Sequence, residues 1–299
     1  MLSLLAAANA AQPLQWSSLG LTPGIELGFF TLRWYSLAYL AGLVLAYLHL
    51  SKMIKAPGAP MAHRHAEDLF FYCTLGVILG GRLGYALFYD PALFTTSRDG
   101  IWSLLRLWDG GMSFHGGVMG VMIATLWVCF RNGLPFVRVM DYIAVNVPFG
   151  MFFGRLANFV NGELWGRTTD VPWAMTFCDI EHTAHSCVSS YVARHPSQLY
   201  QAGLEGLVLM IVMLTLFWRT SARFRPGMLV GVFTLGMGAA RFINEFFREP
   251  DVQLKWLVDM TGLSMGQWLS IPLVLVGIVL IAYARRRPPL ATGTATAAG

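Results

Sequence analysis

Charged side chains are scarce in this chain. Asp, Glu, Lys and Arg account for 12% of its 299 residues, whereas hydrophobic residues account for 56%. Because about a quarter of the residues in a soluble domain are charged, the composition excludes an ordinary soluble domain and predicts a membrane protein. The formal net charge of +5 suits contact with anionic membrane lipid, and we expect no nucleic-acid partner.

Cysteine is also rare, and its spacing does not favour a metal site. The four cysteines form no CxxC pair and show no Cys/His ligand spacing, so we expect no bound metal. Cys73 and Cys129 fall in apolar runs and are expected to be small packing residues. Cys178 and Cys187 fall in one polar loop, and the sequence leaves open whether they form a disulfide.

Internal repeats are not evident, which disfavours a transporter built from inverted repeats. Residues 288–299 are rich in Ala, Thr and Gly. Such a segment cannot form a core, and we expect a disordered cytoplasmic tail. Residues 1–11 have small residues typical of a signal peptide, but they lack a basic region and a long apolar stretch, so we expect them to be retained.

Long apolar segments make up most of the remaining chain. A helix needs about 20 residues to cross the hydrocarbon core of a bilayer, and seven segments are long and apolar enough. They are expected near Gly28–Leu50, Leu69–Tyr89, Phe114–Phe130, Val139–Phe159, Gln198–Trp218, Gly227–Phe247 and Trp268–Ala284. Because backbone groups inside lipid must pair within each span, the sequence predicts an all-α polytopic protein with one seven-helix membrane domain over residues 1–287.

The distribution of basic residues predicts the orientation of this bundle. One set of alternate loops has a clear excess of basic over acidic residues: Lys52, Lys55, Arg64, Arg131, Arg138, Arg219, Arg223, Arg225 and Arg285 to Arg287. The positive-inside rule places these loops in the cytoplasm. The N-terminus is then extracytoplasmic, the C-terminus is cytoplasmic, and residues 161–196 form a small extracytoplasmic head.

Polar residues gather at the outward end of the fourth predicted helix. The segment Gly154–Arg167 places five of them there: Arg155, Asn158, Asn161, Glu163 and Arg167. An arginine at membrane depth is costly and needs a partner, and a guanidinium group fits phosphate oxygens in pairs. Snorkelling to the headgroup layer would explain one arginine, but five clustered polar residues favour a binding site.

Further polar residues lie in other predicted helices. Four lie on one stripe of the sixth: Arg241, Asn244, Glu245 and Arg248. They form either a structural ion pair or the lining of a wet cavity. Glu205, in the fifth helix, needs a partner, and His115, between two glycine pairs, is either structural or a proton acceptor. Together these residues predict an outward cavity suited to an anionic amphiphile.

The segment Gly154–Gly166 (Gly-Arg-Leu-Ala-Asn-Phe-Val-Asn-Gly-Glu-Leu-Trp-Gly) resembles the signature of bacterial prolipoprotein diacylglyceryl transferases. Five more blocks extend the resemblance over most of the chain: Arg33–Tyr35, Gly80–Gly84, Ser113–Gly117, His195–Tyr200 and Arg241–Asp251. One departure is Met237, where the family often has a tyrosine.

The resemblance implies an enzyme that moves the diacylglyceryl group of phosphatidylglycerol to the lipobox cysteine thiol of a prolipoprotein signal peptide. The products are a thioether and glycerol phosphate, and no cofactor is needed. It implies that Arg155 and Arg241 are catalytic, with Arg155 also binding substrate. The remaining residues expected to contact or position the substrate are Tyr35, Asn158, Asn161, Glu163, Gly166, Glu245 and Arg248.

His115 is expected to be the catalytic general base, because an imidazole titrates near about 6.5. Alternatively, it only holds the lipid headgroup and the thiol loses its proton elsewhere. Two other functions remain possible from the residues alone. A lipid transporter or flippase also needs intramembrane arginines, and a structural subunit would pair its buried charges only with each other. The enzymatic hypothesis requires Arg155 and Arg241 to converge on one phosphate.

Overall fold

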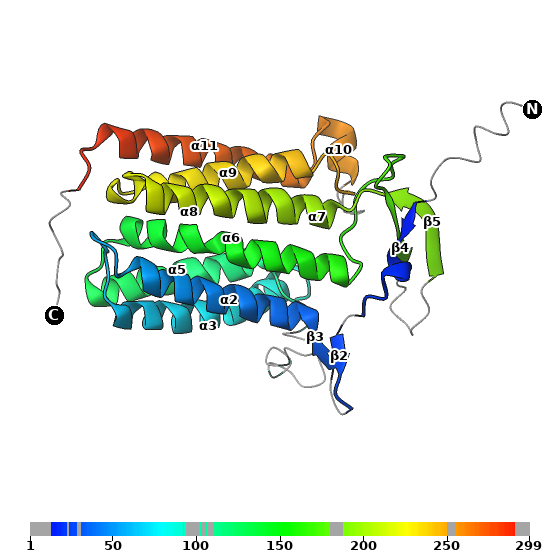
Figure 1. Ribbon diagram of the computed structural model, residues 1–299, viewed down its shortest axis with the longest axis horizontal. Helices are drawn as coiled ribbons and strands as arrows, with labels where there is room; N and C mark the ends of the chain where they lie inside the picture. Colours follow the sequence, from blue (N-terminus) through cyan, green and yellow to red (C-terminus); the bar gives the residue numbers. More distant parts are fainter. Residues whose placement is uncertain are drawn as a thin grey trace, which may run out of the picture.

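Long apolar helices lie side by side along one axis in the computed structural model (Figure 1). The structure describes residues 13–22, 24–28, 31–91, 93, 102, 106, 111–179, 188–249 and 255–290. Cys187 and the tail after residue 290 lie outside this part of the chain, as does the side chain of Cys178, so the disulfide and the disordered tail stay predictions.

In the part of the chain that the structure describes, seven helical spans build the bundle. They are α2 (Trp34–Met53), α3 (His63–Phe88), α5 (Phe114–Asn132), α6 (Phe136–Val160), the continuous run of α7 (Ser197–Gln201), η5 (Ala202–Val208) and α8 (Leu209–Arg219), α9 (Met228–Asn244) and α11 (Met265–Arg286). Within the described ranges, six of these spans are long and apolar enough to cross a membrane, and the seventh, α9, is a shorter apolar helix. The predicted all-α polytopic membrane fold is confirmed.

The first two spans begin at residues other than those predicted. Thr31–Arg33 forms strand β3, which pairs with β2 (Gly24–Glu26) in an antiparallel hairpin, so α2 starts at Trp34 and not at Gly28. In the second span, the amide of Ala62 donates to the His65 side chain at 3.1 Å. This bond stabilises a polar first turn, and α3 therefore starts at His63 and not at Leu69.

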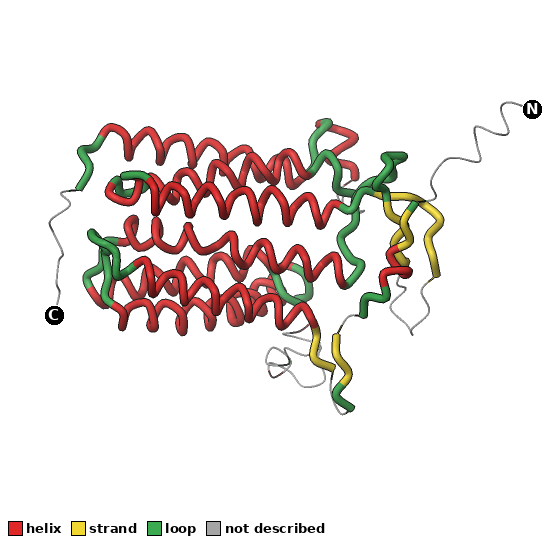
Figure 2. Tube along the Cα trace, in the orientation of Figure 1, coloured by secondary structure: helices red, strands yellow, loops and turns green. Residues whose placement is uncertain are grey.

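Short strands gather at one end of the bundle (Figure 2). Strands β1 (Leu14–Gln15), β4 (Met175–Asp179) and β5 (Val188–Arg194) form a sheet in the order β1-β4-β5, with β1 parallel to β4 and β4 antiparallel to β5. Trp16 is buried against this sheet, and its indole nitrogen donates to the Phe159 carbonyl at 2.8 Å. The strand-bearing end, called the head end below, therefore includes the described N-terminal strand as well as the described residues of the predicted 161–196 insertion.

The main apolar core lies toward the opposite end of the bundle. Tyr142 of α6, Phe217 of α8 and Leu229 of α9 are fully buried there, together with Met53 at the end of α2. We call this the core end. Helix α6 lies in the middle, with α2, α3 and α5 on one side and α7 to α9 and α11 on the other (Figure 1). Polar groups on α6 near the head end can therefore meet groups from both sides.

Glycines bring α3 and α5 into direct backbone contact. A Cβ atom on Gly116 would collide with the Gly80 carbonyl oxygen, and one on Gly120 would collide with the Gly76 carbonyl oxygen. Small residues at such positions allow membrane helices to approach closely. The contact explains Gly116, next to His115, and fixes the first turn of α5, which carries this histidine, against α3.

Candidate active site

The last turns of α6 and the following loop hold the Glu163 carboxylate. Asn158 donates from Nδ2 to Glu163 Oε1 at 2.8 Å, and Asn161 donates from Nδ2 to the same oxygen at 3.3 Å. Glu163 is itself exposed. Three of the residues expected from the sequence are thus brought together, with two amides fixing one carboxylate at the rim of the helix bundle.

The turn after Glu163 has an unusual backbone that α7 holds in place. Leu164 has a φ of 58°, and among the described residues it is the one non-glycine with positive φ. Such a conformation costs about 1–3 kcal/mol. Gln198 donates to the Glu163 carbonyl at 2.6 Å and Ser197 donates to the Leu164 carbonyl at 3.1 Å. The His195–Tyr200 block therefore stabilises the turn that positions Glu163.

Gly166 lies where three backbone segments meet. Its amide donates to the His195 carbonyl at 2.9 Å, and the next amide, of Arg167, donates to the Phe247 carbonyl at 2.8 Å. A Cβ atom on Gly166 would lie 2.7 Å from the His195 carbonyl oxygen, closer than non-bonded atoms approach. The close approach alone requires glycine, and it ties the head end to the chain just beyond α9.

Arg155 and Arg241 converge on one buried carboxylate. Glu205 of η5 is fully buried, and its Oε2 lies 3.5 Å from Arg155 Nη2, while its Oε1 lies 3.9 Å from Arg241 Nη1. Asn244 also donates to Oε1, at 3.3 Å. Because the two carboxylate oxygens belong to one group, both guanidinium groups lie within reach of a common phosphate.

A second buried carboxylate, Glu245, holds Arg241 from the other side. Arg241 Nη2 lies 2.7 Å from Glu245 Oε1, and Arg248 Nη1 lies 3.4 Å from the same oxygen. Ser264, at the start of α11, donates its hydroxyl to Glu245 Oε2 at 2.7 Å. Arg241 is therefore fixed between two carboxylates. Met237, one turn earlier on α9, packs against the apolar core.

These five side chains form what we call the arginine–carboxylate cluster: Arg155, Arg241, Arg248, Glu205 and Glu245. Arg155 and Arg241 share the Glu205 carboxylate as a partner. The side chains of Arg155 and Arg241 keep 20% and 21% of their surface exposed. Guanidinium groups bind phosphate oxygens in pairs, so the exposed parts of these two side chains can bind one negative phosphodiester.

Tyr35 lies at the edge of the cluster. It is in the first turn of α2, its hydroxyl lies 3.1 Å from that of Tyr39, and the charges of Glu163 and Arg155 act on it. The ring is partly exposed. Tyr35 is therefore near the two residues with which the sequence grouped it.

His115 lies in the first turn of α5 and is exposed. Its ring contacts that of Phe114 edge to face. In the part of the chain that the structure describes, no hydrogen bond or ion pair joins it to Arg155 or Arg241. The hypothesis that it is the general base stays a prediction.

His195 and Tyr200 support the head end. The imidazole Nδ1 of His195 lies 3.1 Å from the Tyr200 hydroxyl, and Trp173 donates to the same hydroxyl at 2.6 Å. Burial lowers the pKa of His195 below its usual 6.5. His195 is therefore neutral near pH 7 and is part of the scaffold.

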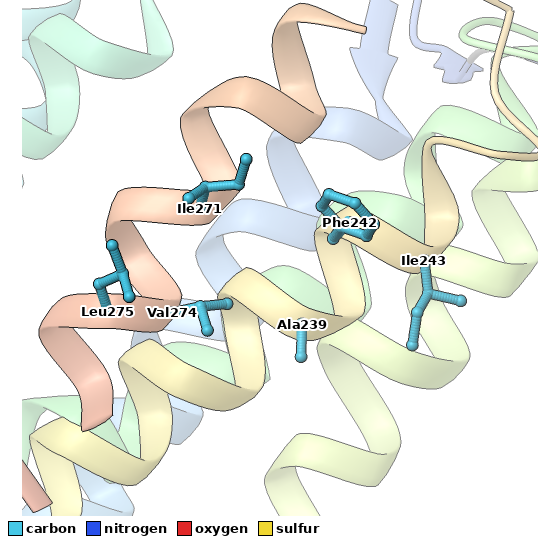
Figure 3. Close-up of a pocket in the computed structure, with 6 residues that line it drawn as sticks. All are labelled: Ala239, Phe242, Ile243, Ile271, Val274 and Leu275. Atoms are coloured by element: carbon cyan, nitrogen blue, oxygen red, sulfur yellow. The ribbon is translucent and has the colours of Figure 1, made fainter. Parts of the chain in front are cut away.

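An apolar groove lies on the other face of α9. Figure 3 shows it between α9 and α11, lined by Ala239, Phe242, Ile243, Ile271, Val274 and Leu275. Arg241 is two residues from both Ala239 and Ile243, so its side chain leaves the helix on the opposite side. The groove is therefore separate from the cluster.

Sequence reasoning missed some residues of this site. Ser264 and Gln267 form a capping box at the start of α11. Their Ser-x-x-Gln pattern is a recognisable helix-start signal, but it did not show that Ser264 would reach Glu245. Glu205 was expected to need a partner, and the structure supplies three, Arg155, Arg241 and Asn244.

An apolar helix bundle with clustered arginines and carboxylates at one end defines an integral membrane protein with a charged site in its helices. The sequence profile of the prolipoprotein diacylglyceryl transferase family matches residues 24–283. The chain therefore belongs to this family and is a bacterial membrane protein.

Curated relatives cover nearly the whole chain. A phosphatidylglycerol–prolipoprotein diacylglyceryl transferase of Erythrobacter litoralis is 65% identical over 278 residues, which cover 93% of this chain and 94% of the relative. A protein with the same name from Zymomonas mobilis is 45% identical over 284 residues, which cover 92% and 94%. A similarity of this extent includes both the bundle and the head end.

Proposed function

We propose that this protein transfers the diacylglyceryl group of phosphatidylglycerol to the lipobox cysteine thiol of prolipoproteins, forming a thioether and releasing glycerol phosphate. The observation that carries the proposal is the convergence of Arg155 and Arg241 on Glu205. The relatives bear the name of this activity. The signal peptide around the lipobox and the surrounding membrane lipid are the expected partners.

The chemistry accounts for the two arginines. The cysteine sulfur attacks the glycerol carbon that carries the phosphate, a carbon–sulfur bond forms, and the carbon–oxygen bond breaks with its electrons moving to the phosphate. Negative charge therefore grows on the leaving oxygen. Arg155 and Arg241, held in advance by Glu205 and Glu245, can stabilise this charge without reorganisation.

Neighbouring residues position these groups. Glu245 and Arg248 orient Arg241, because Glu245 bridges the two guanidinium groups. Asn158 and Asn161 orient Glu163, which lies at the rim where a glycerol hydroxyl or the incoming peptide would approach. Their contribution is orientation, which lowers the entropic cost of bringing lipid and thiol together.

The thiol must lose its proton before or during attack, because a free cysteine has a pKa of about 8.5. His115 is our candidate for the base, and its exposure at the start of α5 leaves it accessible to a peptide. The pH profile of the lipidation rate should contain one ionisation fewer in a His115→Asn variant than in the unmodified protein. A profile identical to that of the unmodified protein would exclude this role.

We also propose that the head end is extracytoplasmic in the inner membrane. Basic residues in the last turns of α5, α8 and α11 support this orientation, since Arg131, Arg219 and Arg285 all mark the core end. The N-terminus would then be outside and the C-terminus inside.

The test is lipidation by purified protein in detergent, with phosphatidylglycerol and a lipobox peptide. We expect a peptide with the mass of the thioether adduct, and Arg155→Ala or Arg241→Ala should reduce its formation by more than about 100-fold. Arg219→Ala, an exposed arginine at the core end, is the matched control and should retain activity. A flippase or a structural subunit would form no adduct.

A further inference from the structure

Three buried amides lie beside the arginine–carboxylate cluster. Gln198 and Gln201 of α7 and Asn244 of α9 are 0%, 1% and 1% exposed. Gln198 and Asn244 each use their NH₂ group, the first toward the Glu163 carbonyl and the second toward Glu205. Within the described chain, their amide oxygens have no hydrogen-bond partner, and neither end of the Gln201 amide has one.

An unbonded buried amide is unusual and costly. A methionine or leucine would fill the space of Gln201 without this cost. Gln201 precedes Glu205 by four residues, so the two side chains share a face of the helix about one turn apart. Glu205 itself lies in η5, a π-helix that begins directly after Gln201, and π-helical turns occur frequently at functional sites. These features indicate that the amide serves a ligand.

We propose that Gln201, with the free amide oxygens of Gln198 and Asn244, binds the glycerol hydroxyls of the phospholipid headgroup and so determines which headgroup is used. The inference rests on the proposed function. A neutral amide donates two hydrogen bonds and accepts others, and a diol does both at each hydroxyl. With the phosphate on Arg155 and Arg241, the headgroup glycerol extends toward the amides one turn away.

The hydrogen-bonding capacity of the site favours a diol over an ammonium group. Amide oxygens alone would also accept hydrogen bonds from the ammonium of phosphatidylethanolamine. An ammonium group, however, has no acceptor, so the unpaired NH₂ group of Gln201 would stay unpaired beside it, whereas hydroxyls can pair with both ends of that amide. Selectivity thus arises from anion binding and from neutral hydroxyl recognition together.

The experiment compares two lipids with one product. Phosphatidylmethanol has the same diacylglyceryl group and phosphodiester charge as phosphatidylglycerol but no headgroup hydroxyl, so both lipids give the same thioether peptide. We expect the unmodified full-length protein to prefer phosphatidylglycerol in kcat/KM. In Gln201→Met this preference should fall by about 10-fold or more, the effect of about one lost hydrogen bond to a buried amide. Gln201→Asn, which keeps a shorter amide, should show a smaller fall.

The matched control is Asn146→Leu, which removes a buried amide of α6 whose oxygen pairs with His49 and whose NH₂ donates to the Tyr142 carbonyl. It should leave the lipid preference unchanged. The inference would be overturned, while the proposed function stands, if the unmodified protein used both lipids equally well. It would also be overturned if the Gln201 variants lost activity toward both lipids in the same proportion. If the unmodified protein formed no thioether peptide with phosphatidylglycerol or with phosphatidylmethanol, the proposed function itself would be overturned.

Discussion

Two buried carboxylates hold α9 from its two ends, and they do so with different partners. At the core end, Asp141 accepts the backbone amides of Gly227 at 2.8 Å and Val230 at 2.9 Å. At the head end, Glu205 accepts the side chain of Asn244 and pairs with Arg155 and Arg241. The first caps the start of a helix, whereas the second keeps two cations in place.

The difference separates stability from function in this bundle. Backbone amides at a helix start are permanent partners, and each amide that donates to Asp141 has no second hydrogen for a ligand. Guanidinium groups have five donors each, and Glu205 uses only part of those on Arg155 and Arg241. The remaining donors are available to a phosphate. A buried carboxylate therefore indicates a site only when its cations keep donors to spare.

The largest effect should come from Glu205→Gln. Removing one partner of a buried ion pair costs about 3–5 kcal/mol, and here it leaves Arg155 and Arg241 to repel each other. We expect kcat/KM for lipidation to fall by more than about 100-fold. Activity within about threefold of the unmodified protein would show that Glu205 and Asp141 play the same structural part.

Asp141→Asn should have the opposite profile. The variant amide places an NH₂ group against the backbone N–H groups of Gly227 or Val230, so we expect unfolding in detergent to become easier by about 1–3 kcal/mol. The kcat of the folded fraction should remain that of the unmodified protein. Thermal unfolding and active-fraction titration measure the two quantities separately, and a kcat loss at full stability would contradict the comparison.

Two glycines of the same sequence block sharpen the comparison within the head end. A Cβ atom on Gly166 would collide with His195 and Phe247, whereas one on Gly154 would meet no atom within 4 Å. Gly166→Ala should therefore cost about 1–3 kcal/mol through overpacking and reduce lipidation. Gly154→Ala should leave stability and lipidation within about twofold. Equal effects of the two substitutions would show that the close approach at Gly166 is not what matters.

The smallest effect should be a pH dependence from His195. Burial lowers its folded-state pKa below 6.5. Below about pH 6.5, the unfolded chain therefore binds more protons at His195 than the folded chain does. The contribution of neutral His195 to stability is complete above about pH 6.5 and decreases as the pH falls below it. Between pH 7.5 and 5.5, the Tm of the unmodified protein should fall more than that of His195→Asn. Parallel curves would show that another group is responsible.

The positions of the helices could be predicted because lipid imposes a simple length requirement. Each apolar run corresponds to a helical span, and the polar residues of α6 and α9 meet at one end, as their places near the ends of predicted spans implied. The start of α2 could not be predicted, because Thr31–Arg33 belongs to a strand only through its pairing with Gly24–Glu26. A three-residue strand has no pattern of its own.

The connections within the site were beyond prediction for a similar reason. Trp16 reaches the sheet of the head end from a segment far away in the sequence, and Ser264 reaches Glu245 from the start of α11. Gly166 resembled a substrate-binding residue by its place in a block, but the structure gives it a steric reason, since its backbone meets His195 and Phe247.

The sequence by itself determined that the chain is a helical membrane protein with arginines and acids in its apolar spans. Composition and the length of apolar runs are sufficient for this, because every backbone group in lipid must be paired locally. Only the tertiary structure decided which charges share a partner. Ion pairs between α6, η5 and α9 depend on the packing of helices distant in sequence, and no local pattern specifies that Arg155 and Arg241 meet on Glu205.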